Sequence, residues 1–238
     1  MIDFPSKGKY GAEDLCRIVE ILRGEGGCPW DRVQTHETLR RNLLEECDEL
    51  CEAIDRADPS MMLEELGDVW LQVIFHASIE RQKGSFDLED VADAECRKLI
   101  SRHPHVFGTV QVSGVEHELQ VWEELKRKEK HQMAPSDAMD SVCRTLPGLW
   151  RAEKIQKKGE IAPSSEEIGH ALRSGAETLV AMLDSPAGEE RKAALGELLF
   201  AAVCAARRLG IDPEEALHAR CEEEIRRFRD READQNNG

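Results

Sequence analysis

The feature of this sequence that most constrains its fold is a pair of amphipathic helical patterns that occurs twice along the chain. Apolar residues recur at three- and four-residue steps over 39–54 and 66–77, and a turn with proline at 56–60 separates the two runs. This spacing places apolar side chains on one face of each helix and predicts a helical hairpin. Shifting the chain by 129 positions lays 45–68 on 174–197 without a gap. The sequence therefore predicts an all-α tandem repeat.

The repeat also suggests where the chain divides. After a deletion of four residues the match resumes, with 84–91 resembling 209–216. The polar stretch 131–137 has the composition of a join between domains. We therefore expect a first helical domain over 1–132 and a second one over 133–238.

Composition narrows the classes of molecule that this protein can bind. The chain has 48 acidic and 32 basic residues among 238, a net charge of −16, which repels nucleic acids and anionic membranes. A small phosphorylated substrate stays possible, because a divalent metal can reverse the local field of an acidic site. The eight cysteines form no C-x-x-C pair, and no apolar run has the length of a signal peptide or membrane span. These features predict a cytoplasmic protein without membrane partners or a zinc ribbon.

A constellation of five acids lies on the first predicted hairpin. Its first helix carries Glu45-Glu46-x-x-Glu49, and its second carries Glu65-x-x-Asp68. Residues three apart lie 60° apart around a helix and about one turn apart along it. When two antiparallel helices pack through their apolar stripes, the edges that bear these acids can face each other. Four of the carboxylates, those of Glu46, Glu49, Glu65 and Asp68, would then surround one volume.

Carboxylates this close repel one another unless a cation lies between them. All-oxygen ligation favours magnesium, manganese or calcium over zinc, and magnesium suits a site that also binds phosphate oxygens. The alternative is that these acids form ordinary solvated helix faces. Against it, Glu46 and Glu65 border the apolar stripes, and the motifs occur as a pair on consecutive helices. A di-iron carboxylate bundle would require Glu-x-x-His pairs, which the hairpin lacks.

The acidic motifs, together with two flanking segments, resemble the MazG family of nucleoside triphosphate pyrophosphohydrolases. The flanking segments are Cys28-Pro-Trp-Asp31-x-x-Gln-Thr35 and Arg102-His-Pro-His-Val-Phe107. The resemblance implies an all-α fold that forms a homodimer, and cleavage of nucleoside triphosphates between the α and β phosphates. It further implies that Mg²⁺, with Mn²⁺ as a possible substitute, is held by four of the acids, and that Glu45 orients or deprotonates the attacking water. The implied metal ligands are Glu46, Glu49, Glu65 and Asp68, and Glu45 and Glu46 are the candidate catalytic residues.

Candidate substrate-binding residues lie outside the hairpin. Lys98 and Arg102 are one turn apart on the helix that follows it, and could bind phosphate. The alternative is a surface pair at a helix end. Trp30 could stack on the base and Gln34 could hydrogen-bond to its edge, although a tryptophan here is as often a core or lid residue.

The second repeat has lost the acids. The five acidic positions correspond, at the offset of 129, to Ser174, Gly175, Thr178, Ala194 and Glu197. One carboxylate cannot hold magnesium usefully, so we expect this repeat to be catalytically silent and structural or regulatory. The erosion also leaves an alternative open, in which the chain is a non-catalytic nucleotide sensor or a partner-binding protein.

The second helix of the first hairpin is apolar on two sides. Besides its main stripe it carries Leu71, Phe75 and Ile79 at four-residue steps. A helix buried on two faces lies inside a bundle or at a subunit interface. The pattern is therefore compatible with a homodimer and also with internal packing.

Overall fold

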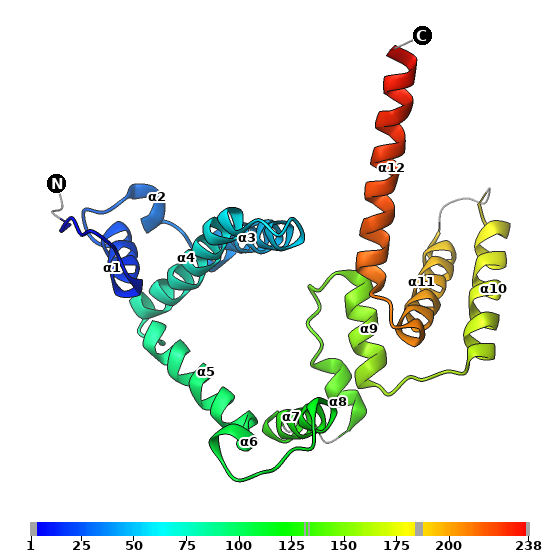
Figure 1. The fold of residues 1–238 in the computed structure, drawn as a ribbon, viewed down its shortest axis with the longest axis horizontal. Helices are drawn as coiled ribbons and strands as arrows, with labels where there is room; N and C mark the ends of the chain where they lie inside the picture. The colour runs from blue at the N-terminus through cyan, green and yellow to red at the C-terminus, as the bar shows by residue number, and fades with distance from the viewer. Residues whose placement is uncertain (1–3, 131, 133, 184–187, 237–238) are drawn as a thin grey trace. The chain divides into compact units, whose positions relative to one another are not determined.

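The computed structural model describes residues 4–130, 132, 134–183 and 188–236, and all of its regular structure is helical (Figure 1). The expected all-α class is confirmed. Contacts divide the chain into two compact units, Met1–Ser113 and Gly114–Gly238. The domain boundary at 132/133 was inferred from the sequence repeat, and it stays a prediction.

Both units are built around one helical hairpin with shorter helices beside it. We call α3 and α4 the first hairpin, and α10 and α11 the second hairpin. The helices of the first unit are α1 (Ala12–Arg23), α2 (Pro29–Arg32), α3 (His36–Asp55), α4 (Pro59–Lys83), α5 (Leu88–Arg102) and α6 (Pro104–Phe107). Those of the second are α7 (Val115–Glu129), α8 (Pro135–Asp140), α9 (Gly148–Lys158), α10 (Ser165–Ala181), α11 (Glu189–Leu209) and α12 (Pro213–Asn236).

Local sequence signals set the ends of the first hairpin. The Thr35 hydroxyl accepts from the Thr38 amide at 3.3 Å, which caps the start of α3. Asp58 accepts from the amides of Ser60 and Met61 at 2.9 and 3.2 Å, and so caps the start of α4. Helix α4 ends at Gly84, whose φ of 74° is in the left-handed region that favours glycine.

The core of the first unit lies between α1 and the hairpin. Val19 of α1, Leu39 of α3, and Ile74, Phe75 and Ile79 of α4 are at most 5% exposed and form one cluster. Phe75 and Ile79 therefore pack inside the unit, as does the partly buried Leu71. The second apolar side of α4 accordingly serves internal packing.

A different side of α4 is left open in the single chain. Leu63, Leu66, Trp70 and Val73 are exposed to 76, 52, 43 and 40%, and their spacing places them along one stripe. We call these four residues the exposed α4 stripe.

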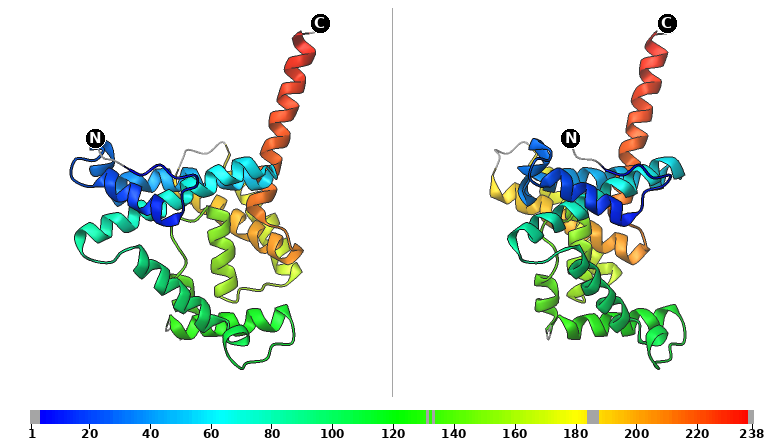
Figure 2. Two further views of the ribbon diagram at one scale, coloured as in Figure 1. Left: turned by 60° about the vertical axis from the view of Figure 1, so that its left-hand side comes forward. Right: turned by 90° about the vertical axis from the view of Figure 1, so that its left-hand side faces the viewer.

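The second unit repeats the hairpin. The helices α10 and α11 lie side by side as α3 and α4 do, and α9 packs on α11 in the way that α1 packs on α4 (Figures 1 and 2). The offset of 129 carries the start of α3 to the start of α10 within one residue. The structure corrects one detail of the sequence match: Gly210, with φ of 69°, ends α11 as Gly84 ends α4, where the match had paired Gly84 with Leu209.

Helix α12 follows the second hairpin as α5 follows the first, but continues for 24 residues (Figure 2). Asp212 accepts from the amides of Glu214 and Glu215 at its start, as Asp87 does at the start of α5. Within the part of the chain that the structure describes, every helix is too short or too polar to cross a lipid bilayer.

Candidate active site

Three of the predicted metal ligands converge between the two helices of the first hairpin. Glu46 and Glu49 of α3 and Glu65 of α4 each offer a carboxylate oxygen, and these oxygens all lie within 4.8 Å of one another. Glu65 is 8% exposed, Glu46 is partly buried and Glu49 is open to solvent. We call these three residues the acidic cluster. Its position, at the edge of the apolar stripes, leaves one side accessible to a ligand.

The acidic cluster is electrostatically unfavourable on its own. Burial raises the pKa of Glu46, and the carboxylates of Asp68 and Glu49 raise it further. Burial likewise raises the pKa of Glu65, followed by the charges of Glu49, Glu64 and Asp68. A cation among these groups would reverse the effect, because it stabilises each charged form.

Asp68 and Glu45 have different relations to the cluster. Asp68 is, after burial, the largest contributor to the raised pKa of Glu46, so its carboxylate lies close to that residue. Glu45 contributes less, and its carboxylate accepts from Arg41 Nε at 2.7 Å on the open side of α3. Asp68 therefore acts on the cluster by its charge but lies outside the set of oxygens within 4.8 Å, and Glu45 also lies outside that set.

The residues present fit a magnesium ion. Oxygens that bind one Mg²⁺ at about 2.1 Å lie at most about 4.2 Å apart, so the cluster would need to contract by little. Every donor is a carboxylate oxygen, the type that magnesium and manganese prefer. The raised pKa values of Glu46 and Glu65 also mark a site that lacks a counter-charge in the protein itself.

Gln72 is a residue of this site that the sequence analysis missed. It is 7% exposed on α4, and its side chain lowers the pKa of Glu46 as a hydrogen-bond donor. Its Oε1 atom is buried without a partner. The signal was present in the sequence, because a polar residue four positions after Asp68 and seven after Glu65 lies on the same face of the helix.

The predicted substrate-binding residues are placed on other elements of the unit. Lys98 forms an ion pair with Glu95 of its own helix α5, and Arg102 is buried at the end of that helix. Trp30 is largely exposed on α2. The Gln34 side chain donates to the Trp30 carbonyl at 2.9 Å and accepts from the Thr38 hydroxyl at 2.7 Å, so it ties α2 to α3. Their roles with substrate stay predictions.

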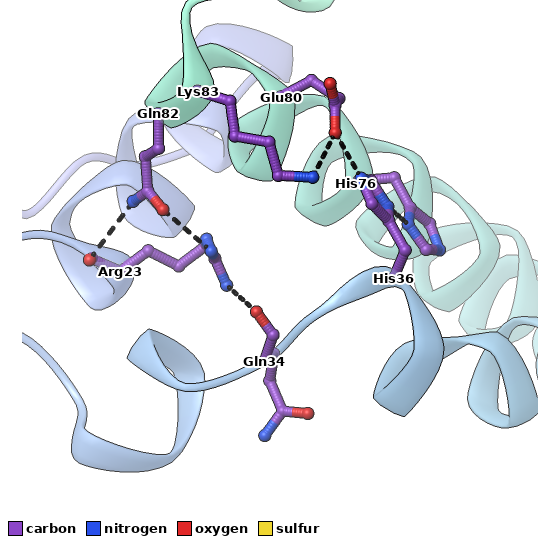
Figure 3. A network of polar contacts seen from close by, with 7 residues as sticks. All are labelled: Arg23, Gln34, His36, His76, Glu80, Gln82 and Lys83. Carbon is purple, nitrogen blue, oxygen red and sulfur yellow. Dashed lines mark hydrogen bonds and ion pairs between the residues drawn. The ribbon is translucent and has the colours of Figure 1, made fainter.

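A polar network joins the start of α3 to the end of α4 (Figure 3). The Nδ1 atoms of His36 and His76 are 2.6 Å apart, and His36 Nε2 lies 2.6 Å from a Glu80 oxygen. Lys83 donates to the same oxygen at 2.6 Å. Hydrogen bonds from Lys83, His36 and Ser85 lower the pKa of Glu80 to about 2. Glu80 is therefore ionised at neutral pH and anchors both helix ends.

The buried Arg23 extends this polar region into α1. Its guanidinium donates to the Gln34 carbonyl at 3.5 Å and to Gln82 Oε1 at 3.0 Å (Figure 3). It also donates to the Asp31 carbonyl at 2.6 Å. The segment that carries Trp30 and Gln34 is thereby fixed to the C-terminal part of α4.

The corresponding place in the second hairpin is a hollow. A pocket of about 520 Å³ is lined by all five residues that replace the acids, together with apolar neighbours from α10 and α11. The five are Ser174, Gly175, Thr178, Ala194 and Glu197. Four of the five acids are thus replaced by smaller side chains, the fifth stays acidic as Glu197, and the hairpin around them is kept.

The chain is similar to several known proteins. A family model for the MazG nucleotide pyrophosphohydrolase domain matches residues 34–107, from the segment before α3 to the end of α6. The nucleoside triphosphate pyrophosphohydrolase/pyrophosphatase MazG of Thermotoga maritima is 39% identical over 218 residues, which cover 91% of this chain and 84% of that protein. The nucleoside triphosphate pyrophosphohydrolase of Escherichia coli K12 is 38% identical over 229 residues, 91% of this chain and 85% of the relative.

A longer relative also matches. The uncharacterized protein YabN of Bacillus subtilis is 41% identical over 216 residues. These cover 89% of this chain but 44% of YabN, so the chain spans less than half the length of that relative.

Proposed function

The chain belongs to the MazG family of nucleotide pyrophosphohydrolases, and on that premise we propose that it hydrolyses nucleoside triphosphates at the acidic cluster of its first unit. The products are a nucleoside monophosphate and pyrophosphate, and the cofactor is Mg²⁺, with Mn²⁺ as a substitute. The single observation that supports this location is the convergence of three carboxylate oxygens from α3 and α4 within 4.8 Å.

Each acid has a role in the proposal. Glu46, Glu49, Glu65 and Asp68 hold the metal, which when bound would neutralise phosphate charge and stabilise the charge that develops during in-line displacement. Glu45, at the rim of the cluster, orients the attacking water and accepts its proton. Gln72 lowers the pKa of Glu46, against the raising effects of burial and the neighbouring acids, and so favours the charged form that binds metal.

The cations and the aromatic residue of the first unit complete the substrate site in this proposal. Lys98 and Arg102 bind phosphate oxygens, and Trp30 and Gln34 contact the base. The fixed position of the Trp30 segment, held by Arg23, supports the second assignment because a rigid platform loses little entropy on binding.

The assembly that we propose is a homodimer that uses the exposed α4 stripe. Leu63, Leu66, Trp70 and Val73 leave apolar surface on a helix whose other sides are packed. A second copy of the same stripe would cover it through a symmetric contact. The second unit, whose hairpin keeps its fold without the acids, is catalytically silent.

The proposed substrate and the free cysteines both point to a reducing compartment such as the cytoplasm. All eight cysteines are free thiols, as is usual for proteins of that compartment. Nucleoside triphosphates are the partners in this proposal, and nucleic acid is disfavoured by the net charge of −16.

The test is product identification with a panel of ribo- and deoxyribonucleoside triphosphates. We expect release of pyrophosphate and monophosphate with Mg²⁺, and no release when the metal is chelated. Release of inorganic phosphate and diphosphate would place the cleavage at another bond. Nucleotide binding without turnover of any member of the panel would instead favour the sensor function.

The assignment to the acidic cluster is tested by Glu65→Gln with Glu52→Gln as its control. Glu52 lies on the same hairpin but is exposed and paired with Arg56. We expect the first variant to lose activity and the second to keep it. Equal activity in the two variants would contradict the proposed site.

A further inference from the structure

Gln72 presents an unsatisfied atom beside the acidic cluster. Gln72 is 7% exposed, and its side chain lowers the pKa of Glu46, as a hydrogen-bond donor to that carboxylate does. A carboxylate only accepts, so the amide NH₂ faces Glu46 and the carbonyl Oε1 is the free end. This Oε1 has no partner. A buried acceptor without a donor is costly, and such atoms in native proteins often belong to ligand sites.

His76 presents a second unsatisfied atom on the same side of α4. It lies four residues after Gln72, and helical side chains lean toward the N-terminus, so it leans toward the Gln72 turn. Its Nε2 atom is buried without a partner. Two unpartnered polar atoms thus lie on one face of α4, next to the turn that carries Asp68.

The network of Figure 3 determines what His76 Nε2 can do. Glu80, with a pKa of about 2, is ionised and accepts the proton of His36 Nε2. In the tautomer of His36 that donates Nε2–H to Glu80, Nδ1 accepts from His76 Nδ1 at 2.6 Å, and His76 keeps a lone pair on Nε2. In this tautomer both free atoms, Gln72 Oε1 and His76 Nε2, are acceptors.

The second hairpin shows that the fold does not need this pair. At the offset of 129, Gln72 and His76 correspond to Ala201 and Ala205. The neighbouring core positions stay apolar and buried, since Ile74 and Phe75 correspond to Val203 and Cys204. The acceptor pair was lost together with the acids and not with the core.

Gln156 of the second unit shows what a structural glutamine looks like in the same chain. It is fully buried, its Nε2 donates to the Phe200 carbonyl at 2.9 Å, and its Oε1 accepts from Arg207 at 3.3 Å. Both ends of Gln156 are satisfied by the protein. Gln72 has only one end satisfied.

We propose that Gln72 and His76 bind one hydrogen-bond donor group of the reaction complex beside Glu46, either the attacking water or a hydroxyl or amino group of the nucleotide. This inference rests on the proposed function and adds two residues that contact the reacting molecules. Water and an amino group each carry two hydrogens, enough to satisfy both acceptors at once. Glu80 and His36 act as positioning residues, because they fix the tautomer of His76.

The experiment removes each acceptor alone and measures turnover and binding separately. Gln72→Met keeps the volume of the side chain without its acceptor, and His76→Phe does the same for the ring. Gln156→Met is the control for loss of a buried amide. Turnover is measured as pyrophosphate release with Mg²⁺, and binding is measured by calorimetry with a nonhydrolysable α,β-imido triphosphate. Melting temperatures show whether each variant is folded.

The expected result is a loss of about tenfold or more in kcat/KM for Gln72→Met and His76→Phe, while Gln156→Met lowers the melting temperature and leaves kcat/KM unchanged. If kcat falls and analogue affinity is unchanged, the donor is the attacking water. If analogue affinity falls, the donor belongs to the nucleotide. Two further analogues then identify the group: a 2′-deoxy analogue lacks the sugar hydroxyl, and a uracil analogue lacks a base amino group. The analogue that lacks the donor group should bind to wild type and to Gln72→Met with equal affinity.

Two results would overturn the inference. One is kcat/KM and analogue affinity within twofold of wild type in both variants. The other is a loss of activity that follows the melting temperature in the same way as for Gln156→Met. If the wild-type protein binds the analogue but releases no pyrophosphate, the proposed function fails, and the binding measurements on Gln72→Met still decide the role of the acceptor pair.

Discussion

The two hairpins of this chain have the same fold and different chemistry. Both start at a hydroxyl cap, Thr35 for α3 and Ser164 for α10, and both end at a left-handed glycine. The core positions also agree, since Leu39 and the corresponding Ile168 are both buried. The site positions do not, because four of the five acids of the first hairpin correspond to small residues around a pocket in the second. Folding and catalysis therefore depend on separate sets of positions in this helix pair.

The physical reason is where each set lies on the helices. Core positions face the partner helix, where any apolar side chain of suitable size stabilises the hairpin. The acidic positions lie at the edge of that contact, where crowded carboxylates are unfavourable without a cation, as the raised pKa values of Glu46 and Glu65 show. Replacing them with Gly175 and Ala194 removes repulsion, so the fold survives the loss of the site.

The largest expected effect is on catalytic activity, which substitutions in the first hairpin should reduce and substitutions in the second should not. Glu49→Gln should reduce pyrophosphate release by about 100-fold or more, because it removes a charged oxygen donor from the proposed metal site. Glu197→Gln, which alters the one acid retained in the second hairpin, should leave it unchanged. The measurement is the initial rate with Mg²⁺ for both variants at equal melting temperature. A comparable loss in Glu197→Gln would mean that the second hairpin takes part in catalysis.

The next effect concerns assembly. The α4 stripe has a shorter counterpart on α11, where Leu195 and Leu199 are 44 and 45% exposed. Leu66→Glu should weaken the homodimer by about tenfold or more, because a charge in an apolar contact must be desolvated. Leu195→Glu should have a smaller effect. Sedimentation equilibrium over a range of concentrations measures both, and a wild-type protein that is monomeric throughout would contradict the dimer.

A smaller effect concerns acid sensitivity. The pKa of Glu80 is about 2 in the fold and near 4.5 when unfolded, so its stabilisation is present above pH 4.5 and is lost as the pH falls toward 2. Burial and the charge of His36 lower the pKa of His76 below 6.5, so stability also falls as the pH drops through 6.5. In the second hairpin Ala206, four residues before the terminal Gly210, takes the place of Glu80, and Ala205 takes the place of His76.

The first hairpin should therefore lose protection at acid pH before the second does. Hydrogen-exchange protection factors, corrected for the intrinsic rate at each pH, measure the two hairpins in one experiment. Glu80→Gln should flatten the dependence below pH 4.5. Equal loss of protection in α3 and α10 between pH 7 and pH 5 would be incompatible with this account.

The smallest expected effect is the loss of stability on removing a helix cap, and it should be the same in both hairpins. Thr35→Ala and Ser164→Ala each remove a cap and should each lower the free energy of unfolding by about 1 kcal/mol. Urea unfolding of the two variants provides the values. A much larger cost for Thr35→Ala would show that the cap also supports the network around Gln34, which accepts from Thr38.

The sequence predicted the hairpins and three of the converging acids because both follow from helical geometry alone. Glu46 and Glu49 are one turn apart on α3, Glu65 lies on the antiparallel helix of the same hairpin, and the structure places their oxygens within 4.8 Å. The expected contact through the 66–77 stripe is only partly correct, because Leu66 and Val73 are exposed. Helical geometry alone did not predict which face of α4 packs inside the unit. Both sides of α4 are apolar, and only the position of α1 decides that Phe75 and Ile79 are covered while Leu66 and Val73 stay exposed.

By itself, then, the sequence determined the helical hairpins, the repeat and the acidic motif, since periodicity and spacing are properties of neighbouring residues. The tertiary structure decided which groups are left unsatisfied. Gln72 and His76 are ordinary polar residues in the sequence, and their significance comes from burial next to partners on other turns and helices. Whether a buried acceptor finds a donor depends on atoms far apart in the chain, and no local pattern encodes it.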